Sequence, residues 1–128
     1  MIERSPGDPP SPWEARFGFS RVVQAGPLVV LAGTTSVGPS GAIIGETPYE
    51  QTAEILRKVV HELERRGLGV DSVVQTRIYV TDISRAEEVG RAHGEVFGEH
   101  RPAMSMIEIS RLIDPRMLVE IEAVAYTG

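Results

Sequence analysis

Few residues in this chain have side chains suited to catalysis, and two glutamates near the C-terminus are the strongest candidates. Glu120 and Glu122 alternate with Leu118 and Val124, so on a β-strand the four side chains point to one face. A carboxylate that is partly buried in a cleft has a raised pKa and could hold or activate a water molecule. A solvated or paired strand face would show the same pattern, so the sequence leaves both interpretations open. Glu108, on the preceding strand, is expected to lie beside the pair.

His93 is the histidine with the most informative surroundings. It shares a helical repeat with Val89 and Phe97, which indicates either a half-buried structural residue or one that transfers protons or binds a ligand. His61 and His100 fall on expected surface positions. The chain has no cysteine, and no spacing of His, Asp or Glu matches a metal-binding motif. We therefore expect neither a bound metal nor a cofactor.

A glycine-rich segment over residues 33–45 is a further candidate for ligand contact. It lacks the lysine of a phosphate-binding P-loop and the spacing of a dinucleotide-binding turn. Gly33 and Thr34 could still present N–H and hydroxyl donors where a strand ends. No serine lies in a G-x-S-x-G turn, so nothing indicates a hydrolase triad.

The composition is that of a single globular domain with an excess of acidic residues. The chain has 128 residues, of which 41% are hydrophobic, enough for one core. Its formal charge of −5 opposes binding to nucleic acid. We find neither an apolar run long enough to span a membrane nor a signal-peptide pattern, so we expect a cytoplasmic protein without membrane contact. The prolines within residues 1–12 predict a flexible arm, followed by one domain over residues 13–128.

These candidates are held by elements whose expected order is β-β-α-β-α-β-β. Capping boxes beginning at Thr47 and Ser84 predict two helices. On the first helix, Gln51 and Glu62 fall outside the apolar stripe. Alternating apolar residues predict strands over residues 22–24, 28–32, 73–80, 103–109 and 117–126, with a short additional strand over residues 42–44.

The strands carry apolar residues on both faces, although two helices can cover only one face of such a sheet. Leu28 and Val30 point away from Val29 and Leu31, and both sets are apolar. A large apolar surface left uncovered is typical of an interface. The sequence therefore predicts an oligomer of this chain.

Several segments of the sequence resemble the Rid (YjgF, endoribonuclease L-PSP) family. They are Gln24-Ala25-Gly26 with Leu28-Val29-Val30-Leu31-Ala32-Gly33, then Tyr79-Val80-Thr81-Asp82, Arg101-Pro102-Ala103 and Glu120-Ile121-Glu122-Ala123. The resemblance covers nearly all of residues 13–126 and implies a chorismate-mutase-like α+β fold with two helices on one face of the sheet. It also implies a homotrimer with a ligand cleft at each subunit interface. Active members hydrolyse reactive enamines or imines to a 2-keto acid and ammonia.

The residues that this resemblance places in the cleft depart from the family pattern. The arginine that grips the substrate carboxylate in active members corresponds to Met104, and the glutamate that positions water corresponds to Glu120. A thioether offers apolar surface and no hydrogen-bond donor, so the standard activity is not expected. Four other positions also differ: a tyrosine becomes Phe19, a serine Ala32, an asparagine Gly90 and a cysteine Met106.

The remaining members of the expected ligand site are Arg21, Gly33, Thr34, His93 and Ser105. Arg21, Arg77 or His93 could replace the lost cation, but the sequence does not place them. With Glu120 as the one familiar polar group, the altered cleft indicates a small carbonyl or imine compound as ligand.

Three functions therefore stay open at this point. The first is a homotrimer that binds such a metabolite between subunits, with altered chemistry around Glu120. The second is an imine deaminase that uses a substitute cation. The third is RNA cleavage, an activity attributed to some family members, against which the charge of −5 argues.

Overall fold

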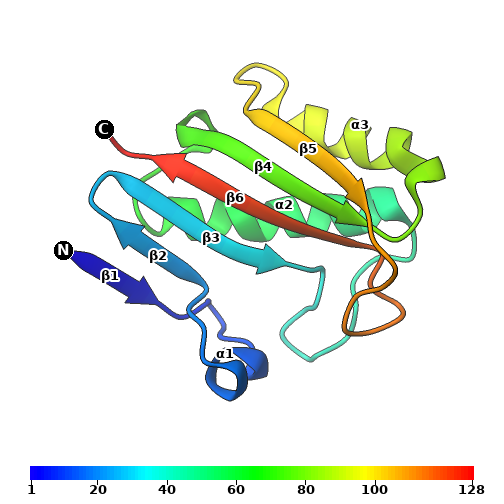
Figure 1. Cartoon of the computed structure of the whole chain (residues 1–128), viewed down its shortest axis with the longest axis horizontal. Helices are drawn as coiled ribbons and strands as arrows, with labels where there is room; N and C mark the ends of the chain where they lie inside the picture. Colours follow the sequence, from blue (N-terminus) through cyan, green and yellow to red (C-terminus); the bar gives the residue numbers. More distant parts are fainter.

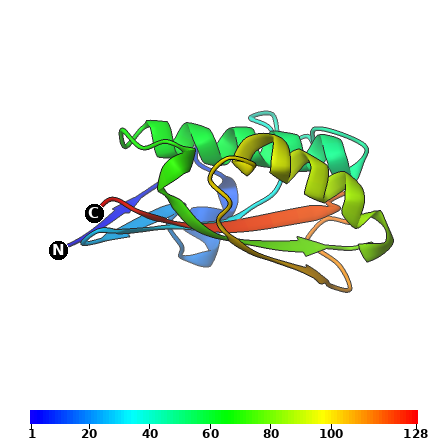
Figure 2. The same ribbon diagram turned by 90° about the horizontal axis from the view of Figure 1, so that it is seen from above.

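A six-stranded mixed sheet carries two long helices along one of its faces (Figures 1 and 2). The computed structural model describes residues 1–128. The strands are β1 Ile2–Ser5, β2 Val22–Ala25, β3 Leu28–Thr34, β4 Val73–Val80, β5 Ala103–Glu108 and β6 Val119–Tyr126; the helices are α1 Pro12–Phe17, α2 Pro48–Glu64 and α3 Ala86–Phe97. Short 3-10 turns at Val70–Ser72 and Ile83–Arg85 precede β4 and α3. The predicted α+β fold is confirmed.

The last strand of the chain, β6, lies in the middle of the sheet rather than beside its sequence neighbour β5. The strand order is β1-β2-β3-β6-β4-β5, and only β4 and β5 run parallel. The prediction that Glu108 lies beside Glu120 and Glu122 is therefore wrong, because the crossover through α3 places β5 on the far side of β4. Glu108 Oε1 instead accepts a hydrogen bond from the Ile83 N–H at 3.0 Å.

The start of α2 has the predicted capping box. Thr47 Oγ1 accepts from the Glu50 N–H at 3.1 Å, and Glu50 Oε1 accepts in return from the Thr47 N–H at 3.2 Å. Pro48 occupies the first helical position, where no N–H is needed. These contacts satisfy donors that the first turn leaves free, so the helix starts at one defined residue.

The start of α3 differs from the predicted capping box at Ser84. The helix begins at Ala86, and the residue before it, Arg85, makes no side-chain cap. Ser84 belongs to the preceding 3-10 turn, where its N–H and its hydroxyl both donate to Asp82 Oδ1, at 3.0 Å and 2.6 Å. Asp82 is thus the capping residue, because its short carboxylate competes successfully for the donors of that turn.

Two polar residues of α2, Gln51 and Glu62, are buried although they lie outside its apolar stripe. Gln51 donates to the carbonyls of Gly45 and Arg116 and accepts from the Leu118 N–H, so it ties the helix to two loops. Glu62, near the other end, accepts from the Asp8 N–H at 3.1 Å. Both side chains are buried because connecting segments fold over the flank of the helix that the apolar stripe leaves uncovered.

The hydrophobic core fills the space between the two helices and the facing side of the sheet. It contains alternate strand residues and the apolar stripes of α2 and α3, including Val29, Leu31, Ile55, Leu56, Val59, Leu63, Ile78, Val89, Phe97, Val119 and Ile121. Neither α2 nor α3 lies on the opposite sheet face (Figure 2). Leu28 and Val30 are 43% and 45% exposed on this open face. The two-faced apolar strands predicted from the sequence are therefore present.

The first residues of the chain differ from the flexible arm expected over residues 1–12. Residues 2–5 form the edge strand β1, paired antiparallel with β2 from Ile2↔Ala25 to Ser5↔Val22. The prolines begin only at Pro6, so they leave this strand free to pair. The turn that follows is held by buried Glu14, which accepts from the Gly7 N–H at 3.0 Å.

Candidate functional site

Glu120 lies on the open face of β6, in close contact with the backbone of β3. Its side chain is half-buried and makes no hydrogen bond with the rest of the chain. A Cβ atom built at Gly33 would overlap Glu120 Oε1, so the glycine makes room for the carboxylate. The ladder between β3 and β6 is irregular at this point, between the Leu31 and Thr34 pairs. The site is therefore shaped by a backbone irregularity and a residue without a side chain.

The electrostatics around Glu120 favour its protonated form. Burial raises the pKa of its carboxyl above the ordinary value, and the charge of Glu122 raises it further. The positive charge of Arg21 opposes this rise in pKa without cancelling it. A partly desolvated carboxylate without a hydrogen-bond partner can accept a proton from, or return one to, a molecule placed beside it.

The second glutamate of the pair, Glu122, is engaged. The Tyr79 hydroxyl donates to Glu122 Oε1 at 2.6 Å, and this hydrogen bond raises the pKa of Tyr79. The β4–β6 ladder also places Arg77 opposite Glu122. Glu122 is thus hydrogen-bonded on the strand face, whereas Glu120 makes no hydrogen bond within the chain.

Arg21 is the cation whose charge acts on the pKa of Glu120. Its Nη1 donates to the Gly33 carbonyl at 2.7 Å and to Thr34 Oγ1 at 3.2 Å. The Ala32 N–H donates in turn to the Arg21 carbonyl at 2.9 Å. The Phe19 ring lies 5.7 Å from the guanidinium carbon, within the range of a cation–π contact. One group of predicted site residues, Phe19, Arg21, Ala32, Gly33, Thr34 and Glu120, therefore gathers where β3 ends and β6 begins.

Most of the other predicted residues lie on α3 and on the opposite, helix-bearing face of β5. His93 is buried, and its Nε2 is 2.9 Å from Thr76 Oγ1. Burial lowers the pKa of His93, so its imidazole is neutral near pH 7 and does not supply a cation. Met104 is the partner of Thr76 in the parallel ladder, which places the two side chains next to each other on the helix-bearing face.

One chain does not bring all the predicted ligand-binding residues together. Met106 follows Met104 on the same face and packs against the core, whereas Ser105 between them points to the open face opposite Arg77. Gly90 lies on α3, with no atom within 4 Å of where its Cβ would be. His93, Met104 and Met106 thus form a second group, separated from the Glu120 group by the sheet itself.

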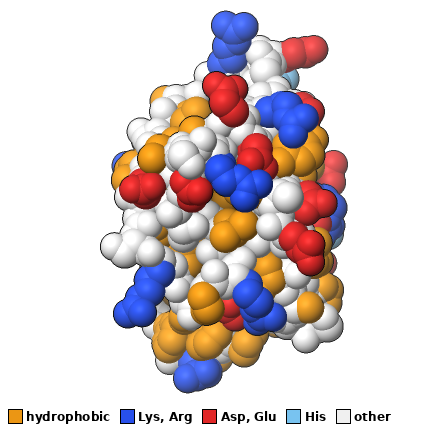
Figure 3. All heavy atoms as spheres, turned by 90° about the vertical axis from the view of Figure 1, so that its right-hand side faces the viewer, with side chains coloured by type: hydrophobic (Ala, Val, Ile, Leu, Met, Phe, Trp, Pro, Cys, Tyr) orange, Lys and Arg blue, Asp and Glu red, His pale blue; other side chains and the backbone are white.

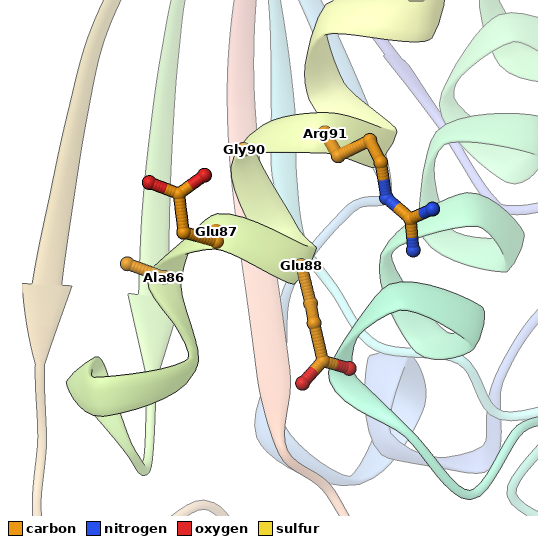
Figure 4. A pocket seen from close by; sticks show the side chains of 5 residues that line it. All are labelled: Ala86, Glu87, Glu88, Gly90 and Arg91. Carbon is orange, nitrogen blue, oxygen red and sulfur yellow. The ribbon is translucent and has the colours of Figure 1, made fainter.

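Two surface hollows lie near these groups, and neither hollow connects one group to the other. One is shallow and lies along the first turns of α3, lined by Ala86, Glu87, Glu88, Gly90 and Arg91 (Figure 4). Glu88 and Arg91 extend there toward α2, and Arg91 lies 4.1 Å from the centre of the Tyr49 ring. The other hollow, of about 80 Å³, is on the open sheet face, where its lining includes Arg77 and Glu122.

The sequence missed one polar residue near the Glu120 group, Lys58 of α2. It lies outside the apolar stripe of the helix, and its Nζ donates to the carbonyls of Thr35 and Val37 at 2.7 Å and 2.9 Å. Burial and the charge of Arg21 lower the pKa of Lys58 to about 8. No helical periodicity signals this contact, because it depends on the path of the loop after β3.

The structure contains neither a cluster of metal-binding side chains nor a helix that could span a membrane. No three His, Asp or Glu side chains cluster as they would around a metal ion. None of the helices combines the length and the apolar composition needed to cross a membrane.

Comparisons of the sequence and of the structure with known proteins indicate the same protein family. The family model described as endoribonuclease L-PSP matches residues 11–127. An uncharacterised protein of Streptomyces coelicolor is 41% identical over 119 residues, which cover 92% of this chain and 88% of that protein. A 2-iminobutanoate/2-iminopropanoate deaminase of Salmonella typhimurium is 32% identical over 107 residues, covering 80% and 82% of the two chains.

Among solved structures, a member of the YjgF family from Mycobacterium tuberculosis has a TM-score of 0.87 and 44% sequence identity. The match covers 98% of this chain and 99% of that one. The family match over almost the whole length, the curated relatives and the shared fold lead to one conclusion: the chain belongs to the endoribonuclease L-PSP family, also known as the YjgF or Rid family.

Proposed function

We propose that this protein binds a small carbonyl- or imine-type metabolite in clefts between the subunits of a homotrimer, the assembly typical of its family. In this proposal Met104 takes the place of the carboxylate-gripping arginine, and Glu120 is the residue that holds or activates water. The observation that carries the proposal is the half-buried Glu120 carboxylate, which has a raised pKa and no hydrogen-bond partner within the chain.

The arrangement of the two residue groups supports a cleft between subunits rather than within one. Glu120 and Gly33 are on the open face of the sheet, whereas Met104 and His93 are on the helix-bearing face. A single chain cannot bring these groups to one ligand. Two copies can do so if the open face of one approaches the α3–β5 edge of the other, which would also cover apolar surface.

A second candidate function is imine hydrolysis, favoured by the deaminase from Salmonella typhimurium and by the presence of Arg21 beside Glu120. Water would add across the C=N bond, its oxygen bonding to carbon and a proton going to nitrogen. The C–N bond would then break as the nitrogen takes a second proton and leaves as ammonia. Glu120 is suited to take the proton from water and return it to the nitrogen.

Binding and activity can be tested together. Isothermal titration with 2-oxobutanoate and with butanone measures ligand binding, and crystals soaked in each compound locate it. Binding against Glu120 and Met104 supports the proposal, and a cleft that stays closed by side chains with both compounds contradicts it. Glu108→Gln is the matched control for Glu120→Gln, because Glu108 lies outside both groups of predicted ligand-binding residues.

For activity, 2-iminobutanoate is generated by an amino-acid oxidase and its loss is followed with and without the protein. We expect Glu120→Gln to lower any acceleration by about 10²-fold or more, the usual contribution of a general acid or base. Loss of the imine at the buffer rate would exclude the deaminase function for this substrate.

RNA cleavage, the activity named in the family description, has little support in this chain. The formal charge is −5, and acidic and basic side chains are interspersed on the surface in Figure 3. Such a surface lacks the electrostatic attraction on which RNA binding depends. An RNA ladder that stays intact during long incubation with the purified protein would agree with this.

A further inference from the structure

Arg77 is a charged residue on the open sheet face, among apolar side chains. It lies on β4 directly opposite Glu122 of β6. Its side chain nevertheless forms no ion pair with Glu122 or with any other carboxylate of the chain. Val30 and Val124 line the same hollow as Arg77 and Glu122. Arg77 is exposed, so in a single chain water solvates its guanidinium.

A hydrogen bond keeps the Glu122 carboxylate out of contact with Arg77. The Tyr79 hydroxyl donates to Glu122 Oε1 at 2.6 Å, although Tyr79 is the ladder partner of Glu120. The hydrogen bond is therefore diagonal and draws the carboxylate along the sheet, away from Arg77. It raises the pKa of Tyr79, and the charge of Arg77 opposes part of that rise. The cation and the second oxygen of Glu122 thus lie in the same region without meeting.

Covering the open face with another molecule would remove the water around Arg77. A buried arginine without an acidic partner is strongly unfavourable, so whatever covers the exposed Val30 has to bring a carboxylate to Arg77. The face itself carries one such group, because Glu122 lies beside Arg77. A second copy of the same face therefore matches it in charge. In a closed ring of identical subunits, each copy presents one side of such a contact to each neighbour.

Glu122 is better placed for this contact than Glu120, the other carboxylate on the open face. Glu122 and Arg77 both line the hollow of about 80 Å³, which has room for the end of a side chain from another copy. Glu120 lies instead against Gly33 and is not part of that lining. Because Tyr79 holds one oxygen of Glu122, the carboxylate is already oriented before a guanidinium arrives.

We infer that Arg77 of each subunit forms an ion pair with Glu122 of a second copy, in the hollow on the open sheet face. The inference rests on the homotrimer of the proposed function and adds the polar contact by which one copy recognises the next. Around the ring, each subunit gives its Arg77 to one neighbour and accepts an arginine at Glu122 from the other. No charge on the covered face is then left without a partner.

The test is a double-mutant cycle on assembly, measured by sedimentation equilibrium over a range of protein concentrations. Arg77→Met and Glu122→Gln each leave one charge buried alone, so each should raise the concentration of half-dissociation by at least about tenfold. The double variant should have a smaller effect than either single one. The amide oxygen of Glu122→Gln can still accept from Tyr79. Arg57→Met and Glu54→Gln, which break an ion pair on the exposed side of α2, are the matched controls and should change nothing.

Cross-linking shows whether the two residues meet between chains. The chain has no cysteine, so a variant with one introduced cysteine cannot form a link within itself. When Arg77→Cys and Glu122→Cys are co-expressed, a short bismaleimide should give a covalent dimer on a denaturing gel, and neither variant alone should do so. A dimer formed by Arg77→Cys alone would place the arginines of different copies together and overturn the inference.

The outcomes separate the ion pair from the homotrimer. A wild-type protein that is monomeric at every concentration refutes both. A stable wild-type trimer in which the two single substitutions have no effect, or add in the double variant, refutes the ion pair between Arg77 and Glu122 alone. Should a single variant fail to fold, the cross-linking decides, and an assembled trimer without the mixed covalent dimer overturns the inference.

Discussion

Two glutamates two positions apart on one strand, Glu120 and Glu122, differ in the contacts that their carboxylates make. Glu122 is paired with the Tyr79 hydroxyl at 2.6 Å. Glu120 lies instead over Gly33, where the absent side chain leaves a place for its carboxylate. The identity of residue 33 therefore decides whether Glu120 can occupy its position at all.

Replacing Gly33 by alanine should displace Glu120. A Cβ there would overlap the carboxylate oxygen, and we expect a loss of about 1–3 kcal/mol in the free energy of unfolding together with loss of Glu120-dependent binding. Gly90→Ala is the matched control, because its Cβ would meet no atom within 4 Å. In the middle of α3 it should gain about 0.5–1 kcal/mol. Urea denaturation of both variants checks this, and equal effects at the two positions would contradict it.

The raised pKa of Glu120 also predicts a pH dependence of stability. When the folded-state pKa is the higher one, the contribution of the group is fully present below its unfolded pKa of about 4.3 and is lost as pH rises through the folded pKa. The variant Glu120→Gln, which cannot ionise, should therefore gain stability over the wild type at pH 7 and not at pH 4. Denaturation midpoints at the two pH values measure this, and a pH-independent difference would be evidence against the raised pKa.

At the scale of the elements, the start of each helix depends on one or two polar residues. Thr47 caps α2 in the predicted way, whereas Ser84 serves the 3-10 turn before α3 and not the helix. The two capping boxes look equivalent in the sequence. They differ because Asp82, just upstream, takes both donors of Ser84.

The two capping-box motifs, at Thr47 and at Ser84, should therefore respond differently to mutation. Thr47→Ala should lower the free energy of unfolding by about 1 kcal/mol, the usual effect of losing an N-cap. Ser84→Ala should have a clearly smaller effect, because its exposed hydroxyl bonds only to Asp82. Chemical denaturation of the two variants under the same conditions provides the measurement. Equal losses would mean that Ser84 caps α3 after all.

Periodicity and caps were enough to predict the main strands, both long helices and the apolar open face. They could not predict that β6 inserts between β3 and β4, since strand order depends on contacts between distant segments. The burial of Gln51 and the loop contacts of Lys58 were missed for the same reason. The position of Glu120 on its strand could be predicted because the strand pattern is local, whereas its contact with Gly33 depends on the pairing between β3 and β6.

At the scale of the whole molecule, the open sheet face exposes apolar side chains that a second subunit could cover. Val30 and Val124 are direct neighbours across the β3–β6 ladder, and Val30 is 45% exposed. In the proposed homotrimer this surface is buried, and its burial would stabilise the assembly by about 25 cal/mol per Å² of apolar area.

A charge placed on this face should therefore separate the subunits. We expect Val30→Asp to run as a monomer, because a buried unpaired carboxylate is strongly unfavourable. Ile83→Asp, at a similarly exposed position of 42% in the connection between β4 and α3, should keep the wild-type mass. Light scattering after gel filtration measures both. An unchanged mass for Val30→Asp would show that the open face is not the subunit contact.

The position of β5 at the edge of the sheet has a consequence for handling the protein. Ala103–Glu108 is exposed along most of its length, pairs on one side only, and carries a single charged residue, Glu108. Such an edge offers free backbone groups on which another chain can add as a strand. A subunit released from the proposed homotrimer would thus be prone to aggregate through β5, and dilution or mild denaturant should be the conditions under which precipitation begins.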